Sequence, residues 1–317
     1  MSASADTGNL ARILQILLGA EIALALFIAW LCWLSLLPGK AMLVWALTPY
    51  VLIRAGILAR GFQLAYKHRS PLSAQHRPSP LSWARVVVGE YVAVLMHYSG
   101  LLPFEQWLLP SAPQPAFSGK GVPVVLVHGF CSNRACWYFF ARWLHKLGVG
   151  PIYAVSLEPL LGTIEDNATR LAPLIEQICE TSKHPKVMLV GHDIGGLVGR
   201  ALVHSSFGVK RLARVVTLGS PHHGSMVIEG IQQYGENLRQ ITLKSNWTER
   251  MSVFERAPSP VPITSLISPQ DEVIAPQTSA VLRYPNAQNL VLKGIGHYEM
   301  LLSRKVVRMV AQVLQQV

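Results

Sequence analysis

The stretch KVMLVGHDIGG, residues 186–196, decides the fold of this chain. Its apolar run predicts a strand, its glycines predict a sharp turn, and residues 197–203 continue as a predicted helix. Strand, sharp turn and helix in this order form a nucleophile elbow, which presents the residue at its tip for covalent chemistry. The tip is ordinarily a serine in the pattern G-x-S-x-G, but here it is Asp193.

Asp193 has a simpler role available as a helix cap. An aspartate before a helix is a favoured N-cap, because its side chain accepts hydrogen bonds from the first helical turn. That role does not explain why Gly191, Gly195 and Gly196 flank it. We therefore interpret Asp193 as a nucleophile.

The remainder of residues 121–317 alternates predicted strands with predicted helices. Apolar runs predict strands at residues 122–127, 151–157, 186–190, 214–218, 263–267 and 289–292. Helical spacing predicts helices at residues 137–147, 163–181, 197–203 and 300–316. This alternation is typical of an α/β fold, with a mostly parallel sheet covered by helices on both faces.

Four polar residues follow predicted strands: His128, Asp193, Asp271 and His297. Ligands of parallel sheets bind at the carboxyl ends of the strands, so these positions indicate a common site.

Each remaining part of a hydrolytic site has a candidate. His297, in a glycine-rich loop, is the candidate general base, and Asp271 would orient its imidazole, with Glu272 as the alternative acid. The order nucleophile, acid, histidine along the chain matches the hydrolase pattern. We expect the backbone N–H groups of Phe130 and Ile194 to form an oxyanion hole.

Residues 121–317 resemble a bacterial lipase of the α/β-hydrolase superfamily. The resemblance rests on VLVHGF at 125–130, SNR at 132–134 with Trp137, LEP at 157–159, the elbow, TLGSPHHGS at 217–225, and the loops of Asp271 and His297. It implies an α/β-hydrolase fold and ester or lipid hydrolysis without a cofactor. Substrate contacts are expected from His128, Gly129, Trp137, His192, Ser220 and His222.

His222 and His223 suggest metal ligands at first sight. In lipases of this kind the segment is structural, and the sequence has no further His/Asp cluster in metal spacing. We therefore expect no metal.

The aspartate departs from the lipase pattern. GHDIGG resembles instead the elbow of epoxide hydrolases and haloalkane dehalogenases, in which a carboxylate attacks carbon and a histidine activates water to hydrolyse the alkyl-enzyme ester. Other residues typical of those enzymes are replaced or cannot be assigned in this sequence. Ile194 stands where a dehalogenase has Trp, Cys131 stands where an epoxide hydrolase has Pro, and Tyr138, Tyr234 and Tyr298 have no assigned role in epoxide activation.

Three hypotheses follow. The first is a lipase-like enzyme that uses Asp193 for ester hydrolysis, acyl transfer or transesterification on an apolar ester or lipid, through a mixed anhydride. The second is an alkyl-enzyme hydrolase. The third is a lipase fold without catalysis, after natural or engineered replacement of the serine; the intact Asp271 and His297 argue against an old loss of activity. An Asp193–His297 pair predicts an imidazole pKa above about 6.5.

Residues 1–69 predict a membrane anchor. Half of the residues in the chain are apolar and only 14% are charged, against about 25% in soluble domains. Residues 13–37 and 41–59 are apolar runs on the scale of the hydrocarbon core, and residues 38–40 form a turn between them. The pair predicts a transmembrane hairpin, in which we expect Glu21 and Arg54 to snorkel to the interface.

Lysine and arginine concentrate after the second run. The positive-inside rule then predicts that both ends of the hairpin and the catalytic domain lie in the cytoplasm. We expect the membrane to be a bacterial inner membrane. One span followed by an interfacial helix would reverse the side. The net charge of +11 accompanies no nucleic-acid motif, so membrane lipids are the expected partner.

Two further segments complete the predicted organisation. Residues 70–120 are expected to hold linkers and an amphipathic helix at 81–109, ahead of a hydrolase domain at 121–317. Residues 225–256 are a predicted lid with a helix at 226–241, and a surface helical insertion is the alternative.

Overall fold

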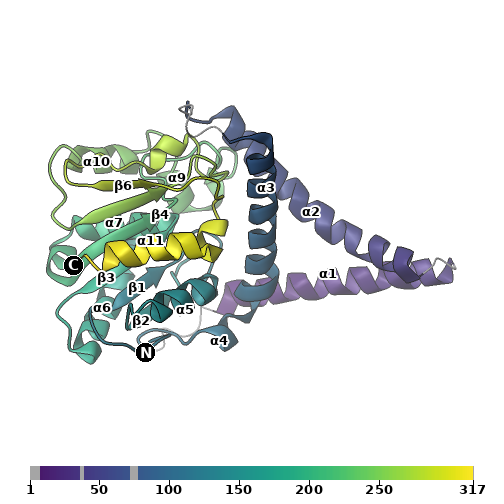
Figure 1. Ribbon diagram of the computed structural model, residues 1–317, viewed down its shortest axis with the longest axis horizontal. Coiled ribbons are helices and arrows are strands. Elements are labelled where there is room, and N and C mark those ends of the chain that lie inside the picture. Colours follow the sequence, from purple (N-terminus) through teal and green to yellow (C-terminus); the bar gives the residue numbers. More distant parts are fainter. Residues whose placement is uncertain (1–7, 36–38, 72–77, 317) are drawn as a thin grey trace.

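The computed structural model in Figure 1 describes residues 8–35, 39–71 and 78–316. It consists of an α/β body and three long helices beside it. The predicted turn at residues 38–40 and the predicted linker at residues 70–80 lie partly outside the described residues.

A six-stranded sheet in the order β2-β1-β3-β4-β5-β6 forms the centre of the body. Every pair of neighbouring strands is parallel. The strands are β1 (Val124–Val127), β2 (Ile152–Val155), β3 (Val187–His192), β4 (Leu212–Leu218), β5 (Ile263–Ile267) and β6 (Gln288–Val291). The predicted α/β fold with a mostly parallel sheet is therefore confirmed.

Helices cover both faces of this sheet. Those of the body are α5 (Tyr138–Lys146), α6 (Ile164–Ser182), α7 (Ile194–Val203), α8 (Ser206–Arg211), α9 (Glu236–Gln240), α10 (Asn246–Phe254) and α11 (Arg304–Leu314). Short 3₁₀ turns lie at η4 (Arg134–Trp137), η5 (Gln232–Tyr234), η6 (Gln277–Ala280) and η7 (Glu299–Leu302).

Alternation along each strand divides the core in two. Val124 and Leu126 of β1 pack in the cluster that contains α5 and α11. Val125 and Val127 pack in the cluster that contains α6 and α7. Successive strand side chains point to opposite faces, so burial on both faces requires the continuous apolar runs seen in the sequence.

Three long apolar helices precede the body: α1 (Gly8–Leu34), α2 (Gly39–Lys67) and α3 (Pro80–Leu95). From α3 the chain continues through a π-helical turn η2 (Met96–Leu101), a 3₁₀ turn η3 (Leu102–Phe104) and α4 (Glu105–Leu108). By length and composition, the helical segments Leu10–Leu34, Gly39–Lys67 and Pro80–Leu108 are each long and apolar enough to cross a membrane. In Figure 1, α3 stands beside the body, while α1 and α2 project away from it and converge at their far end.

The charges inside α1 and α2 pair with each other. The guanidinium of Arg54 donates two hydrogen bonds of 2.8 Å to the two carboxylate oxygens of Glu21. Ser99, in η2, accepts a 2.7 Å bond from the hydroxyl of Tyr50 and a 3.4 Å bond from Arg54. The expectation that Glu21 and Arg54 snorkel to the interface did not include this bidentate ion pair, which satisfies both charges where they stand.

The predicted helix at residues 226–241 is also wrong. Only the 3₁₀ turn η5 and the short helix α9 form there. Gly230 has φ +94°, and Gly235 is extended at φ −163° and ψ 144°, so neither residue continues a helix.

Candidate active site

Asp193 lies between β3 and α7 with φ 51° and ψ −122°. A positive φ is rare for a non-glycine residue, and such strain persists where the surroundings enforce it. Among the described residues, the Asp193 side chain makes no capping bond to α7. This strained turn between a strand and a helix has the geometry of a nucleophile elbow. An N-cap role does not explain the positive φ of Asp193.

The carboxylate of Asp193 is held by the donors predicted for an oxyanion hole. The backbone N–H of Phe130 donates to Oδ2 at 2.9 Å, and the N–H of Ile194 also interacts with the carboxylate. Gly129 leaves room for it, because a Cβ there would lie 2.6 Å from the Asp193 Cβ and 2.7 Å from Oδ2. The aspartate thus places its own oxygen at a donor of the predicted oxyanion hole.

His297 lies against Asp271. Nδ1 of the imidazole is 3.0 Å from Oδ2 and 3.2 Å from Oδ1 of the carboxylate, and both side chains are 2% exposed. Oδ1 of Asp271 also accepts the backbone N–H groups of Val273 and Ile274, which fix its orientation. Glu272, the alternative acid, instead accepts the backbone N–H of His297 at 3.1 Å.

The electrostatics of this cluster place a proton on His297. Burial alone lowers the pKa of this imidazole, but the charge and hydrogen bond of Asp271, with the charges of Asp193 and Glu90, raise the pKa of His297 to about 9. Burial raises the pKa of Asp193, and the charge of His297 and the N–H groups of Phe130 and Ile194 oppose that rise. Two carboxylates flank one imidazole, so near neutral pH the imidazole is the protonated partner.

Two of the predicted substrate-contact residues, His128 and His192, make hydrogen-bond contacts with backbone groups of neighbouring loops. His128 is buried, with Nδ1 2.8 Å from the carbonyl of Gly129 and Nε2 accepting the N–H of Leu157 at 2.8 Å. His192 packs its ring 4.4 Å from the ring of His297 and reaches the carbonyl of His297 at 3.2 Å. Both residues lie beside the site and position its loops.

Three other predicted contacts are buried in the body. Trp137 packs edge-on against Phe140, and Nε2 of His222 lies 3.0 Å from the Thr217 hydroxyl. Ser220 is fully buried below the elbow, next to Gly196. Substrate contact stays a prediction for Trp137, Ser220 and His222, and it requires the site to open.

The space beside Asp193 is small in this structure. The cavity holds about 10 Å³, room for one water molecule. It is lined by His128, Gly129, Phe130, Leu157, Leu160, Asn167, Ile194 and Asn237. Asn237 of α9 closes one side by donating 2.7 Å to the carbonyl of Leu160. The segment predicted as a lid therefore contributes a wall of this cavity.

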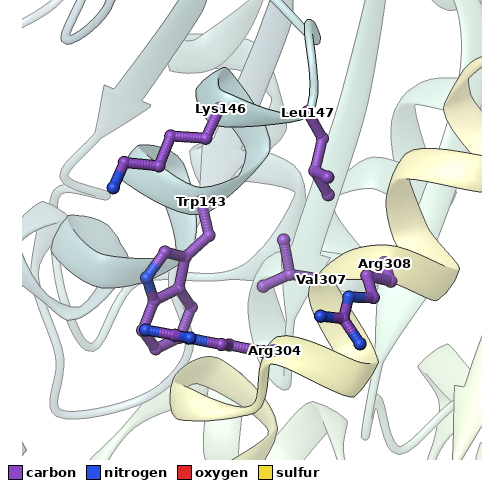
Figure 2. Close-up of a pocket in the computed structure, with 6 residues that line it drawn as sticks. All are labelled: Trp143, Lys146, Leu147, Arg304, Val307 and Arg308. Atoms are coloured by element: carbon purple, nitrogen blue, oxygen red, sulfur yellow. The ribbon is translucent and has the colours of Figure 1, made fainter.

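A larger pocket lies elsewhere, in the surface between α5 and α11 (Figure 2). Its lining is Trp143, Lys146, Leu147, Arg304, Val307 and Arg308. The guanidinium of Arg304 lies 5.3 Å from the centre of the Trp143 ring. None of the predicted site residues lines this pocket.

Sequence reasoning missed the contribution of α3. Glu90 is completely buried and accepts the backbone N–H groups of Tyr298 at 2.6 Å and Glu299 at 3.0 Å. The hydroxyl of Tyr98, in η2, lies 3.1 Å from that of Tyr298. One signal was available, because Glu90 is the only acidic residue in residues 80–104, and a lone acid in an apolar helix is a functional hypothesis by default.

Known proteins resemble the body of this chain. A family model described as "Alpha/beta hydrolase family" matches residues 124–287, just over half of the chain. Lysosomal thioesterase PPT2 of Rattus norvegicus is 29% identical over 144 residues, 43% of this chain and 43% of that protein. A triacylglycerol lipase of Pseudarthrobacter phenanthrenivorans is 29% identical over 124 residues, 37% of this chain and 38% of that protein. The chain thus matches about two-fifths of the length of these relatives.

Solved structures agree on the fold. Lipase B of Aspergillus fumigatus gives a TM-score of 0.55 at 18% identity, covering 65% of this chain and 55% of that one. The mature lipase BlEst2 of Bacillus licheniformis gives 0.51 at 18% identity, covering 62% of this chain and 96% of that one. At these identities the likeness establishes the fold alone.

Proposed function

The chain belongs to the alpha/beta hydrolase family, and from this premise we propose that it is a membrane-anchored hydrolase of the lipase or esterase type. The substrate we propose is an apolar ester or lipid. Asp193 is the proposed nucleophile, His297 the base and Asp271 its partner. The observation that carries the proposal is the buried 3.0 Å contact of His297 with Asp271, in one cluster with the strained Asp193.

The relatives support the substrate class. Those compared above carry the names of a thioesterase and a triacylglycerol lipase. Acyl esters and thioesters share an electrophilic carbonyl carbon, which a nucleophile at an elbow can attack. An anchor in a bilayer would favour apolar acyl chains.

In the proposed ester reaction, Asp193 attacks the carbonyl carbon. The bond to the alcohol breaks, and the imidazolium of His297 gives its proton to the departing oxygen. The product is a mixed anhydride on Asp193. Neutral His297 then takes a proton from water, which attacks the acyl carbon, releases the acid and restores the carboxylate. An alcohol in place of water gives a new ester, which is transesterification.

A second candidate is an alkyl-enzyme hydrolase, and the 2.9 Å bond from the Phe130 N–H to Oδ2 of Asp193 favours it. In this reaction Oδ1 attacks a saturated carbon of an epoxide, and the opened oxygen takes the proton of His297. Oδ2 becomes the carbonyl oxygen of the enzyme ester, already at its hydrogen-bond donors. Water activated by His297 then attacks Cγ, and the oxyanion forms on Oδ2 next to Phe130 and Ile194.

The anchor belongs to the same proposal. Large apolar side chains of α1 and α2 are exposed along both helices, among them Ile16, Leu26, Leu43, Leu52 and Ile57. Exposed apolar surface of this extent marks a membrane or protein contact. We place the anchor at residues 1–69, the connecting segment at 70–120 and the catalytic domain at 121–317, in the cytoplasm beneath a bacterial inner membrane.

The decisive experiment compares the chain with Asp193→Ser, Asp193→Asn and His297→Ala on activated esters of rising chain length. If the unaltered chain turns over and both Asp193 variants are inactive, Asp193 is the nucleophile. A single turnover in heavy-oxygen water then separates the two candidates. Attack on Cγ leaves the label in the Asp193 carboxylate, whereas attack on the acyl carbon leaves it in the product acid.

The opposite result is equally informative. An inert chain whose Asp193→Ser variant gains esterase activity is a lipase scaffold without its nucleophile. That outcome contradicts a catalytic role for Asp193 and directs the search to binding.

A further inference from the structure

The loop that carries His297 is held by two carboxyl groups from different parts of the chain. Glu272, in the loop after β5, accepts the backbone N–H of His297 at 3.1 Å. Glu90, in α3, accepts those of Tyr298 at 2.6 Å and Glu299 at 3.0 Å. Three consecutive N–H groups, beginning at the candidate base itself, therefore donate to two buried acids.

The two acids also contact each other. The side chains of Glu90 and Glu272 approach each other closely enough to interact. Carboxylates only accept hydrogen bonds, so such a contact needs a proton between them. Burial, and then the charges of Glu90 and Asp271, raise the pKa of Glu272 well above its ordinary range. The pair joins α3 to the loops of both Asp271 and His297.

Gly296 shows how closely α3 approaches. A Cβ at this position would lie 2.7 Å from Cδ and 3.1 Å from Cγ of Glu90. Real Cβ atoms essentially never come within 3.0 Å of another heavy atom. The residue before His297 is thus a glycine that leaves room for the Glu90 side chain.

We propose that Glu90 is a positioning residue, which holds the His297 loop in register with Asp271 and makes α3 an integral part of the active site. The proposal rests on the catalytic role given above to His297. Glu90 is 0% exposed and reaches across 208 residues of sequence to the loop. Without it, two backbone N–H groups beside His297 lose their acceptors, which is costly in a buried site. The imidazole then drifts from Asp271.

Several other titratable side chains lie around Glu90 and the His297 loop, and the test leaves them unaltered. The titratable side chains facing Glu90 or its loop are Glu272, His297, Tyr298, Glu299 and Arg85. Arg85 joins α3 to the same loop at its exposed flank, through Glu299 and the carbonyl of Gly294. The loop therefore remains attached to α3 when Glu90 changes, so an effect of Glu90 reports local positioning.

The test uses three variants of the full chain. Glu90→Leu removes both acceptors and keeps the side chain apolar and of similar size. Glu90→Gln keeps one acceptor oxygen and donates to Glu272. Tyr91→Phe is the matched control, because the neighbouring hydroxyl bonds to the carbonyl of Val51 in α2 and not to the loop. Glu90→Leu and Glu90→Gln remove the same charge, so their difference isolates the hydrogen bonds.

Two readouts are needed. In kinetics, Glu90→Leu should lower kcat about 100-fold with little change in KM, the scale of a 1 Å misplacement of a catalytic group. Glu90→Gln should lose roughly tenfold or less, as expected for one lost hydrogen bond, and Tyr91→Phe should match the unaltered chain. In proton NMR, the downfield Nδ1–H signal of His297 bonded to Asp271 should persist in Glu90→Gln and Tyr91→Phe and disappear in Glu90→Leu.

The NMR readout separates this proposal from the proposed function. If the unaltered chain hydrolyses nothing but Glu90→Leu alone loses the His297 signal, the function fails and the positioning role stands. If Glu90→Leu keeps both the signal and the kcat, Glu90 does not position His297. An equal loss in Glu90→Gln and Glu90→Leu would likewise overturn the role assigned to its hydrogen bonds.

Discussion

At the scale of single residues, the central feature of the candidate site is one imidazole whose pKa is raised by neighbouring acidic side chains. His297 has a carboxylate on each side, Asp271 through Nδ1 and Asp193 through its charge. Together these two neighbours raise the pKa of the His297 imidazole to about 9, against the lowering effect of burial. A serine in place of Asp193 would leave one charge fewer, and the imidazole would release its proton at lower pH.

This cluster predicts a pH dependence of stability. The folded-state pKa of His297, about 9, exceeds the unfolded value of about 6.5. The proton is bound more tightly in the folded protein, so the stabilisation is complete below about 6.5 and is lost as pH rises through about 9. In Asp193→Asn the folded-state pKa falls, so the stabilisation is smaller and its loss is complete at a lower pH, while the pH at which the loss begins is unchanged. Thermal unfolding of both proteins in detergent from pH 6 to 10 checks this, and superimposable curves would contradict it.

At the scale of elements, the helices before the body are tied together by polar contacts inside apolar surroundings. Glu21 and Arg54 join α1 to α2, and Tyr50 and Ser99 join α2 to η2, the turn that follows α3. A charge in an apolar helix is tolerated when its partner is supplied by a neighbouring helix. The pair therefore fixes how the two helices lie against each other.

The Glu21–Arg54 pair predicts strong non-additivity. Arg54→Leu leaves Glu21 without its cation, and should destabilise the helices by roughly 3 kcal/mol, the insertion cost of an unpaired charge. The double variant with Glu21→Leu should recover most of that loss, since a paired charge is replaced by apolar packing. Arg60→Leu is the control, because Arg60 donates a hydrogen bond to the exposed side chain of Gln63 in the same helix. Additive losses in a thermal-unfolding cycle would refute the coupling.

Elements that follow from local pattern were predictable. The strand at residues 263–267 was predicted as it is observed, Ile263–Ile267, because a continuous apolar run between polar turns specifies a buried strand. The last helix begins at Arg304 instead of residue 300, because Ser303 has φ −93° and ψ 113° and its side chain caps the N–H of Val306. Apolar spacing alone does not mark such a boundary.

The site divides in the same way. Asp193, Asp271 and His297 could be predicted to share one site because each follows a strand, and parallel strands bring their carboxyl ends together. Glu90 was missed because its partners lie 208 and 209 residues away, and no periodicity within α3 records them. The Glu21–Arg54 pairing was missed for the same reason. Contacts between distant segments depend on packing that local sequence does not encode.

At the scale of the whole molecule, the body and the preceding helices share a core. Leu101, Leu102 and Leu109 are buried in the same cluster as β1, α5 and α11. Asn133 lies just after the loop that contains Phe130, and its side chain donates a hydrogen bond of 2.9 Å to the carbonyl of Leu102. Residues 80–109 therefore pack as part of the body, although the sequence analysis places the start of the hydrolase domain at residue 121.

Truncated chains test whether the folded body begins before α3 or at residue 121. A chain of residues 70–317 keeps α3 and should retain the His297–Asp271 signal and any activity in detergent. A chain of residues 121–317 loses Glu90 together with Leu101, Leu102 and Leu109, and should bind a hydrophobic dye and lose both. Equal activity of the two truncated chains would show that the body is autonomous from residue 121.

The occupied oxyanion hole decides how the protein is seen by chemical reagents. Boronates and phosphonates report serine hydrolases by bonding to the serine oxygen and placing a second oxygen on the hole donors. Here residue 193 is an aspartate, and its Oδ2 already accepts the N–H of Phe130. A survey of whole-cell extracts with such reagents would pass over this protein. A negative result in such a survey reflects the aspartate at residue 193 and says nothing about whether the protein has activity.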